Sequence, residues 1–357
     1  RASDKAKNGK AFTVTVSDNA IEEAKQVLYD IQRDIENGRK PDDFFIGFRT
    51  RAQAGYLEAV FALSDIPYIN TTGTSFWNLK HIQGLISYLK LANDMGNVTD
   101  FQNVYNIPSK WFTVPWRSHD DYGNYCNHRF LGRAFVEECQ SNPNRLHRMC
   151  GIPKYAPGAS DFLGVLSELR GLDPVPAVSY LIENVFTPWI NYEIGDAENN
   201  AGEGGRIDDL GTVLEVAGMF DKVQDFLQYV DKMIEAAKAA QEGDWSNRVV
   251  FSTIHRLKGL ERPVVFGIGM CEGHPENKIA TGLLPHTFSL SLPPSNGKLC
   301  LSGMGKVEDE RCLFYVLITR AKEEVHLSYP RKYRNNSMIS SRFLDEIGLG
   351  KIFELES

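Results

Sequence analysis

Short, continuously apolar runs lie near both ends of this chain and constrain its fold more than any other feature. FFIGF at residues 44–48 is one such run, and VVF at 249–251 and PVVFGIG at 263–269 are two more. Runs of this length are typical of buried strands. Helical periodicity at 21–35 and 52–63 brackets the first run, so strands and helices alternate. We therefore expect an α/β domain whose strands come from both ends of the sequence.

The middle of the chain has a different pattern. From about residue 95 to 243 it is rich in helical periodicity broken by proline and glycine, and it shows no strand-like alternation. This order predicts a mainly helical domain inserted into the α/β domain. We expect the first part of the α/β domain at residues 1–94, the inserted helical domain at 95–243, and the second part of the α/β domain at 244–357.

Charge and composition exclude several classes of protein. The chain has 39 Lys and Arg against 46 Asp and Glu, a net charge of -7, so any contact with nucleic acid must come from a local basic groove. No apolar stretch reaches the roughly 18 to 20 residues that a membrane span needs, and the first residues lack the apolar core of a signal peptide. Six cysteines without regular spacing fit reduced thiols. We expect a cytoplasmic protein with no membrane partner.

Two segments near the C-terminus carry candidate chemistry. STIHRLKGLE at 252–261 places His255, Lys258 and Glu261 between two apolar strands. DERCLFYVLITRAKEEVHLS at 309–328 begins with a helical pattern and ends as a strand, with Arg320 at the junction. An arginine held at such a junction can point at the phosphates of a nucleotide bound by a facing domain.

These motifs resemble those in the C-terminal half of UvrD/Rep/PcrA-type superfamily 1 DNA helicases. STIHRLKGLERPVVF resembles motif V of that family, and DERCLFYVLITRA resembles motif VI. IGFRTRAQAGYLEAVF followed by IPYINTTGTSF resembles the motif IV region, ISYLKLANDMGNVTDFQNVYNIPSK the entry into the family's inserted domain, and SSRFLDEI its closing segment. The resemblance implies a RecA-like fold of the P-loop NTPase type, acting as the second motor domain, for the α/β part.

The resemblance also implies roles for individual residues. Arg320 would be the arginine finger and Glu261 would contact the nucleotide sugar, while His255 and Arg49 would contact single-stranded DNA. The implied nucleotide site comprises Arg320, Glu261 and Gly259, and the implied nucleic-acid site comprises His255, Arg49, Arg51, Gln53, Lys258 and Thr253.

Each of these assignments has a structural alternative. Arg320 and Glu261 could form an ion pair at a sheet edge, His255 could be a structural histidine, and the two arginines at 49 and 51 could be solvated surface charges. The sequence also departs from the family pattern. Arg51 stands where the family usually has Asn, Cys312 stands where it has a second arginine, and the GIG-type turn that grips duplex DNA is absent after NIPSK.

The sequence contains no phosphate-binding loop. Such a loop needs Gly-Lys followed by Ser or Thr, whereas the Gly-Lys pairs at 9, 297, 305 and 350 are followed by Ala, Leu, Val and Ile. We expect most ligands of ATP and Mg²⁺ to lie in an N-terminal half of a larger protein, and we expect the isolated chain to be unable to hydrolyse ATP.

The function implied by the resemblance is ATP-dependent 3′ to 5′ translocation on single-stranded DNA with duplex separation, as in DNA repair, in a nucleoid-associated protein. The expected partners are single-stranded DNA and the N-terminal ATP-binding half, with duplex DNA as a further candidate. The alternative is a non-catalytic nucleic-acid or protein-binding module derived from a helicase. Cys312 and the absent GIG turn favour this alternative, whereas Arg320 and Glu261 argue against it.

Three further features lie outside these motifs. A Cys/His cluster could supply zinc ligands, but its spacing lacks paired CxxC units, so we expect no metal site. A group of aromatic residues could stack on bases, although core packing is the simpler interpretation. The long segment at 273–305 has no assigned role. The cluster is Cys126, His128, Cys139, His147 and Cys150, and the aromatic group is Trp111, Phe112, Trp116, Tyr122 and Tyr125.

Overall fold

The chain forms two compact units. The computed structural model describes residues 12–104, 107, 117–119, 125–127, 156–194, 203–241, 246–257, 259–276, 282–286, 302–334 and 336–349. Arg1–Phe76 and Met233–Ser357 make up the first unit, which is α/β, and Trp77–Lys232 make up the second, which is mainly helical. Helix α3 (Lys80–Ala92) packs with α4, α7, α8 and α10 and therefore belongs to the helical unit. The domain limits expected at 94/95 and 243/244 remain a prediction.

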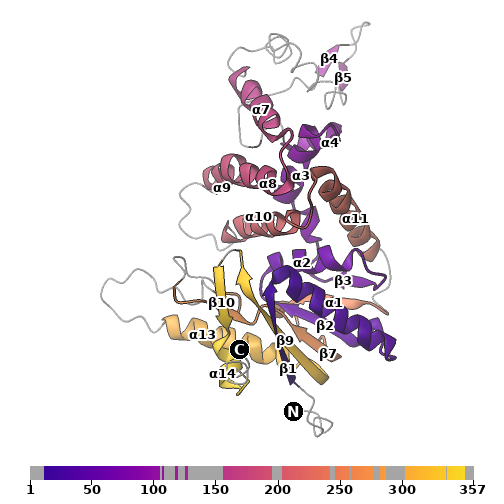
Figure 1. Ribbon diagram of the computed structural model, residues 1–357, viewed down its shortest axis with the longest axis vertical. Coiled ribbons are helices and arrows are strands. Elements are labelled where there is room, and N and C mark those ends of the chain that lie inside the picture. Colours follow the sequence, from indigo (N-terminus) through magenta and orange to yellow (C-terminus); the bar gives the residue numbers. More distant parts are fainter. Residues whose placement is uncertain are drawn as a thin grey trace, which may run out of the picture. The chain divides into compact units, whose positions relative to one another are not determined.

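A mainly parallel sheet forms the centre of the α/β unit (Figure 1). Its parallel strands lie in the order β3-β6-β2-β7-β9, with β1 also beside β9. These strands are β1 (Phe12–Asn19), β2 (Phe44–Phe48), β3 (Tyr68–Asn70), β6 (Val249–Thr253), β7 (Arg262–Gly267) and β9 (Ala321–Tyr333). Strand β10 (Asn336–Ser340) pairs antiparallel with β9 and with β8 (Cys271–Gly273). Because β2 lies between β6 and β7, the expected α/β fold with strands from both ends of the sequence is confirmed.

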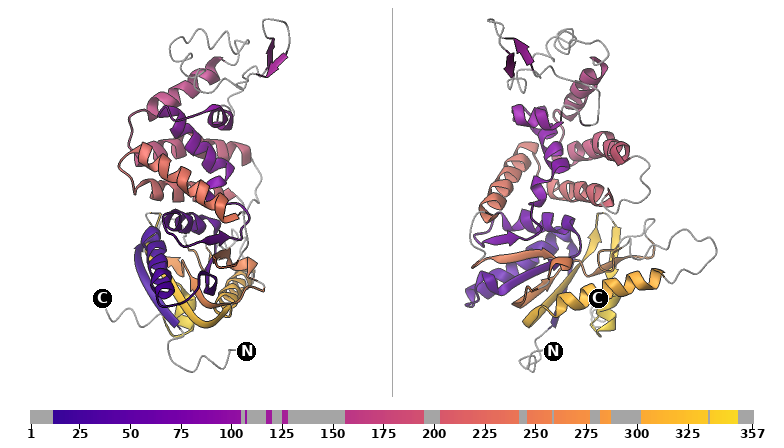
Figure 2. Two further views of the ribbon diagram at one scale, coloured as in Figure 1. Left: turned by 90° about the vertical axis from the view of Figure 1, so that its right-hand side faces the viewer. Right: turned by 180° about the vertical axis from the view of Figure 1, so that it is seen from behind.

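Helices cover both faces of the sheet (Figure 2). Helices α1 (Ala20–Glu36) and α2 (Arg51–Phe61) pack on one face, and α13 (Ser302–Ile318) and α14 (Arg342–Glu346) pack on the other. Asn19 caps α1, since its side chain accepts hydrogen bonds from the backbone N–H groups of Ile21 and Glu22, both at 3.0 Å. The helix is followed by Gly38 at φ +100°, a conformation that favours glycine.

The close approach of α13 to the sheet requires two glycines. Gly47 of β2 and Gly267 of β7 are partners in register, and both lie directly beneath Leu317 of α13. A Cβ atom at Gly267 would lie 2.7 Å from Cδ2 of Leu317, and a Cβ atom at Gly47 would overlap the same side chain. A larger residue at either position would push α13 away from the sheet. The glycine pair therefore fixes the position of the helix that ends just before Arg320.

The helical unit confirms the expected helical content with one correction. Its elements are a short 3-10 turn (Phe76–Asn78), α3, α4 (Val98–Val104), α7 (Ala156–Leu169), α8 (Pro174–Leu181), a π-helical turn (Ile182–Phe186), α9 (Thr187–Ile194), α10 (Glu203–Ala217) and α11 (Val223–Gln241), which continues into the α/β unit. Two strands, β4 (Arg117–His119) and β5 (Tyr125–Asn127), pair antiparallel. The expectation of no strand here was wrong, because strands of three residues are too short to show a period-two pattern. No helix of the described residues is long and apolar enough to cross a membrane.

The closing segment of the chain packs into the α/β core. Phe343 and Leu344 of α14 are buried, and the ring centroid of Phe343 lies 5.6 Å from that of Phe314 in α13. The guanidinium of Arg342 donates to both carboxylate oxygens of Glu272 in β8. This segment therefore joins the two parts of the unit that lie on either side of residues 273–305.

We predict that Phe343→Ala destabilises the α/β unit by about 3 to 5 kcal/mol, because the substitution removes a fully buried ring and leaves a cavity. The measurement is urea-induced unfolding followed by circular dichroism. Ile347→Ala in the same segment is the matched control, since Ile347 is 40% exposed, and its effect is expected to stay within about 0.5 kcal/mol. Similar losses in the two variants would contradict the packing described here.

Candidate nucleotide and nucleic-acid sites

The residues singled out in the sequence lie at opposite edges of the parallel sheet. Arg49 directly follows β2, and His255 follows β6, so both lie at the carboxyl edge. Glu261 directly precedes β7 and Arg320 directly precedes β9, so both lie at the amino edge. We call Glu261 and Arg320 the amino-edge pair. The structure thus brings Glu261 and Arg320, the residues implied to contact a nucleotide, together at one edge. It brings Arg49 and His255, the residues implied to contact single-stranded DNA, together at the other edge.

The amino-edge pair is a loose ion pair. Nη1 of Arg320 lies 3.9 Å from Oε1 of Glu261, and the two side chains are 22% and 55% exposed. Nε of Arg320 donates to the carbonyl oxygen of Val316 at 3.2 Å, which holds the guanidinium against the end of α13. An exposed pair of this length contributes less than about 1 kcal/mol. An incoming phosphate could therefore replace Glu261 as the partner of Arg320 at little cost.

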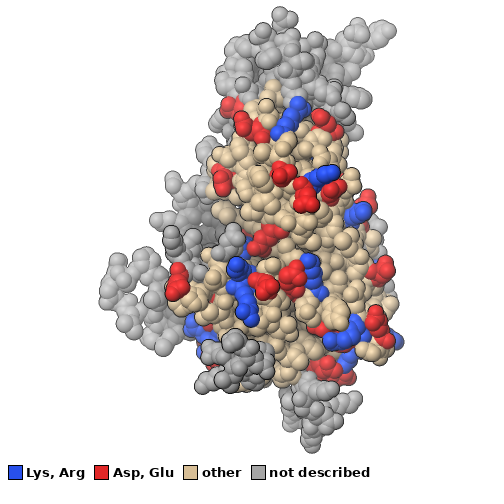
Figure 3. Space-filling view, in the orientation of Figure 1, with Lys and Arg blue, Asp and Glu red and all other residues tan. Residues whose placement is uncertain are grey.

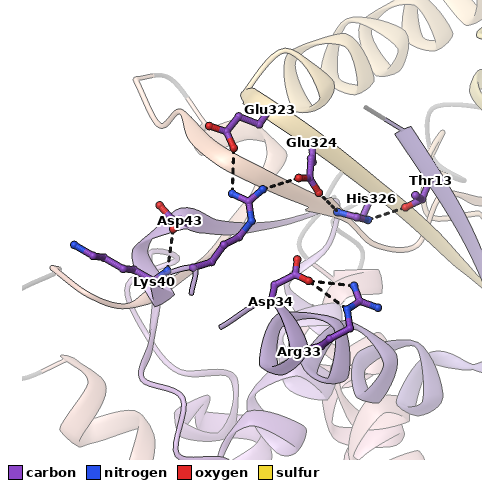
Figure 4. A network of polar contacts seen from close by, with 9 residues as sticks. Thr13, Arg33, Asp34, Lys40, Asp43, Glu323, Glu324 and His326 are labelled. Atoms are coloured by element: carbon purple, nitrogen blue, oxygen red, sulfur yellow. Dashed lines mark hydrogen bonds and ion pairs between the residues drawn. The ribbon is translucent and has the colours of Figure 1, made fainter. Parts of the chain in front are cut away.

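A network of charged side chains anchors the strand that begins after Arg320 (Figure 4). Arg39, just after α1, donates from Nη1 to Glu323 at 3.1 Å and from Nη2 to Glu324 at 2.5 Å. Glu324 also lies 3.4 Å from Nε2 of His326, whose Nδ1 lies 2.7 Å from the hydroxyl of Thr13 in β1. The network ties the start of β9 to α1 and β1, so the position of Arg320 is fixed from the strand side as well as from α13.

The carboxyl-edge cluster comprises Arg49, His255, His286 and Glu310. Nε and Nη2 of Arg49 donate to the carboxylate of Glu310 on α13, at 3.0 and 2.7 Å to different oxygens, in a bidentate ion pair. The side chain of Glu310 is only 3% exposed and that of Arg49 is 19% exposed. The backbone N–H of His286 donates to Oε2 of Glu310 at 3.1 Å. Because the carboxylate is buried, Arg49 is part of the fold of this edge as well as a candidate for binding.

The pKa values of both histidines of the carboxyl-edge cluster are lowered, which favours the neutral form of each ring. Burial, and then the positive charge of Arg49, lower the pKa of His286 to about 4. The same two causes lower the pKa of His255, which is nevertheless exposed at the surface, and Glu310 opposes the shift in both. His286 did not emerge from the sequence, because it lies in the long segment after motif V, where there was no periodic pattern to place it.

Gln53 shapes the loop that carries Arg49. Its side chain is buried, and Oε1 accepts from the backbone N–H groups of Arg49 and Thr50 at 3.0 and 2.9 Å. Nε2 donates to the carbonyl oxygen of Ile268, just after β7, at 3.2 Å. With both ends of the amide engaged, Gln53 is placed to position Arg49 rather than to meet a ligand itself.

The segment after β6 runs from the carboxyl edge to the amino edge across the α13 face of the sheet. Ile254 and Leu257 are buried in the core with Phe314 and Leu317 of α13. Gly259 adopts φ +82°, a left-handed conformation in which a non-glycine residue would be strained. His255 and Glu261 therefore lie at the two ends of one short, anchored connection.

Other predicted residues are placed less specifically. Arg51 is exposed in the first turn of α2, and Thr253 is half-buried at the end of β6. Lys258 lies outside the described residues, as do the zinc candidates and the aromatic group, apart from the backbone of Tyr125 and Cys126 in β5.

On the face shown in Figure 3, the described Lys and Arg side chains are interspersed with Asp and Glu. Binding of a polyanion on this face would therefore depend on local groups.

A RecA-like sheet with one arginine at its α13–β9 junction and another directly after β2 is typical of a helicase C-terminal domain. The chain belongs to the UvrD-like helicase C-terminal domain family, whose sequence model matches residues 2–120 and 197–332.

Curated relatives agree with this assignment. The chain is 27% identical over 329 residues to the putative ATP-dependent DNA helicase YjcD of Bacillus subtilis strain 168, covering 90% of this chain and 38% of the relative. It is 24% identical over 351 residues to the ATP-dependent DNA helicase PcrA of Staphylococcus aureus strain MRSA252, covering 91% and 42%. The chain thus spans about two fifths of the length of these relatives.

We predict that Arg49→Ala lowers the free energy of unfolding by about 3 to 5 kcal/mol, because it leaves the carboxylate of Glu310 buried without its counter-charge. The double variant Arg49→Ala/Glu310→Gln is expected to recover a large part of this loss, since no charge is then buried. Urea-induced unfolding of the wild type, the single variant and the double variant tests this. If the single and double variants were equally unstable, the ion pair would not be what stabilises the edge.

We also predict a pH dependence that originates from His286. Its pKa in the folded chain is lowered below the ordinary value of 6.5 to about 4, so its contribution to stability is present above pH 6.5 and is lost as the pH falls through 4. The stability of the wild type relative to His286→Gln should therefore fall between pH 6.5 and 4. Thermal unfolding of both proteins across this range measures the difference, and a constant difference would refute the assignment.

Proposed function

We propose that this chain is the second motor domain, with its inserted helical domain, of an ATP-dependent helicase that moves 3′ to 5′ on single-stranded DNA. The observation that carries the proposal is the separation of the two groups of implied site residues. Arg320 and Glu261 lie at the amino edge of the sheet, whereas Arg49 and His255 lie at the carboxyl edge. One domain can therefore meet a nucleotide and a DNA strand at the same time.

The amino-edge pair fits the phosphates and the sugar of a nucleotide. The planar cation of Arg320 suits the triphosphate, and the exposed carboxylate of Glu261 suits a sugar hydroxyl. Bound ATP would bring Mg²⁺, which neutralises charge on the β- and γ-phosphates. We place the phosphate-binding loop and most metal ligands in an N-terminal half of a larger protein, so that Arg320 acts across the cleft when the two halves close.

The carboxyl-edge cluster fits a single strand of nucleic acid. Nε and Nη2 of Arg49 are engaged by Glu310, while Nη1 makes no hydrogen bond among the described residues. Nη1 can therefore donate to a phosphate oxygen without breaking the ion pair. His255 is exposed beside it, and Arg51, Thr253 and Lys258 are the further contacts that we assign to the strand.

Two connections join the edges. Helix α13 carries Glu310 toward the carboxyl edge and ends just before Arg320 at the amino edge, and the segment from His255 to Glu261 runs on the same face of the sheet. A shift of Arg320 on closure around ATP would therefore move the partner of Arg49. This is the physical basis that we propose for coupling hydrolysis to movement along the strand.

The second candidate is a non-catalytic binding module derived from a helicase. The observation that favours it is Cys312, exposed on α13 where the family has a second arginine. Such a module would keep the carboxyl-edge cluster but would have no need of Arg320.

The test is phosphate release, stimulated by single-stranded DNA, from the longest product of the source gene. We expect Arg320→Ala to reduce hydrolysis by about a thousandfold or more, the size typical of an arginine finger, while ATP binding is retained. Arg331→Ala, which removes an exposed arginine from the same strand, is the matched control and should be active. The isolated chain should release no phosphate at a steady rate. If the long product binds single strands but hydrolyses no ATP in any variant, the binding module is the correct function.

A further inference from the structure

Glu23 is a buried carboxylate that the proposed nucleotide and strand contacts do not use. It lies in the first turn of α1 and is 3% exposed. Its Oε1 accepts two hydrogen bonds, from the backbone N–H of Gly269 at 2.9 Å and from the hydroxyl of Ser328 in β9 at 2.6 Å. A buried carboxylate is costly to keep, so these contacts need an explanation.

The contacts of Glu23 lead directly to the loop of Arg49. Gly269 follows Ile268, whose carbonyl oxygen accepts from Nε2 of Gln53. The other end of the Gln53 amide accepts from the backbone N–H groups of Arg49 and Thr50. Gly269 has φ +70°, and a Cβ atom there would overlap the Gln53 amide. The partner of Glu23 and the partner of Gln53 are therefore the N–H and the C=O of one and the same peptide unit.

We propose that Glu23 is a positioning residue for the strand-contact loop, acting by holding the Ile268–Gly269 turn against which Gln53 fixes the backbone of Arg49. This inference rests on the proposed function, because it assumes that Arg49 contacts a nucleic-acid strand. The connection from Glu23 to the backbone of Arg49 consists of hydrogen bonds within the chain, so it can be tested without DNA. Glu23 touches neither nucleotide nor strand in this scheme.

The surroundings of Glu23 make its acceptor strength sensitive to pH. Burial raises its pKa to about 7, and the hydrogen bonds from Gly269 and Ser328 oppose the shift. Among the described residues, Cys271 of β8 interacts with Glu23, and the pKa of its thiol is raised by burial and by the charge of Glu23. Because an ionised carboxylate is the stronger acceptor, the turn is held more firmly above pH 7 than below it. The raised pKa also means that the contribution of Glu23 to folding stability is full below pH 4.5 and is lost as the pH rises through 7.

The first measurement is amide hydrogen exchange of the chain without DNA. Glu23→Ala removes the acceptor, and Glu23→Asp withdraws it by one methylene while keeping the charge. Both variants should exchange faster than the wild type at the backbone amides of 49–50 and 269, whereas Glu23→Gln, which keeps a neutral acceptor, should resemble the wild type below pH 7. Glu22→Ala is the matched control, because Glu22 is the exposed neighbour on the same helix. Unchanged exchange at 49–50 in Glu23→Asp would overturn the proposal, even if Glu23→Ala failed to fold.

The second measurement is the affinity for a fluorescent oligo(dT) strand by anisotropy. We expect Glu23→Ala and Glu23→Asp to weaken binding by about tenfold, the equivalent of one charge-assisted hydrogen bond, and Glu23→Gln to change it by less than about twofold below pH 7. Lowering the pH from above 7 to below 7 should weaken the binding of oligo(dT) by the wild type. The same change in pH should weaken binding by Glu23→Gln to a smaller extent.

A double-variant cycle separates positioning from general damage. If Glu23 acts through Arg49, Glu23→Asp should weaken binding little further in an Arg49→Lys background. An equal weakening in both backgrounds would overturn the proposal. Failure of the proposed function has a different signature, because the wild type would then bind no oligo(dT) while the exchange differences at 49–50 persisted.

Discussion

The close packing of α13 on the sheet is the constraint on which both candidate sites depend. It is possible only because Gly47 and Gly267, neighbours in register, leave space for Leu317. The helix carries Glu310, which holds Arg49 at the carboxyl edge, and it ends just before Arg320 at the amino edge. The site residues are therefore not independent additions to the fold. Their relative positions are set by how closely one helix meets two strands.

The two edges differ in how tightly their charges are held. At the carboxyl edge, Arg49 and Glu310 form a bidentate pair that includes a buried carboxylate. At the amino edge, Arg320 and Glu261 are 3.9 Å apart and partly exposed. A buried pair resists rearrangement, because separating it leaves a buried charge without a partner. An exposed pair exchanges partners at little cost. This contrast agrees with the proposed function, in which the carboxyl edge is a fixed surface for a nucleic-acid strand and the amino edge responds to a nucleotide.

The sequence predicted much of this arrangement, and what it missed has physical reasons. Apolar runs such as FFIGF identified the strands, and helical periodicity at 21–35 identified α1, because both signals are local. The pair of Arg49 and Glu310 joins residues 261 positions apart, and no local pattern reports such a contact. Gln53 was expected to contact single-stranded DNA, yet its side-chain amide is buried in the α/β unit. Sequence alone does not show which polar side chain of an amphipathic helix is buried. His286 was missed because its segment has no periodicity, and β4 and β5 because they are too short.

The place of β2 between β6 and β7 also has a consequence for how the chain is made. Thr71, just after β3, donates to the carbonyl oxygen of Phe251, a residue 180 positions further along. At about 5 to 20 residues per second, a ribosome takes roughly 10 to 40 seconds to supply that partner. During this time the first strands have no neighbours and the helical unit emerges complete. The nascent chain must therefore keep an unfinished sheet from aggregating, and compaction of the helical unit shortens the loop that the sheet has to close.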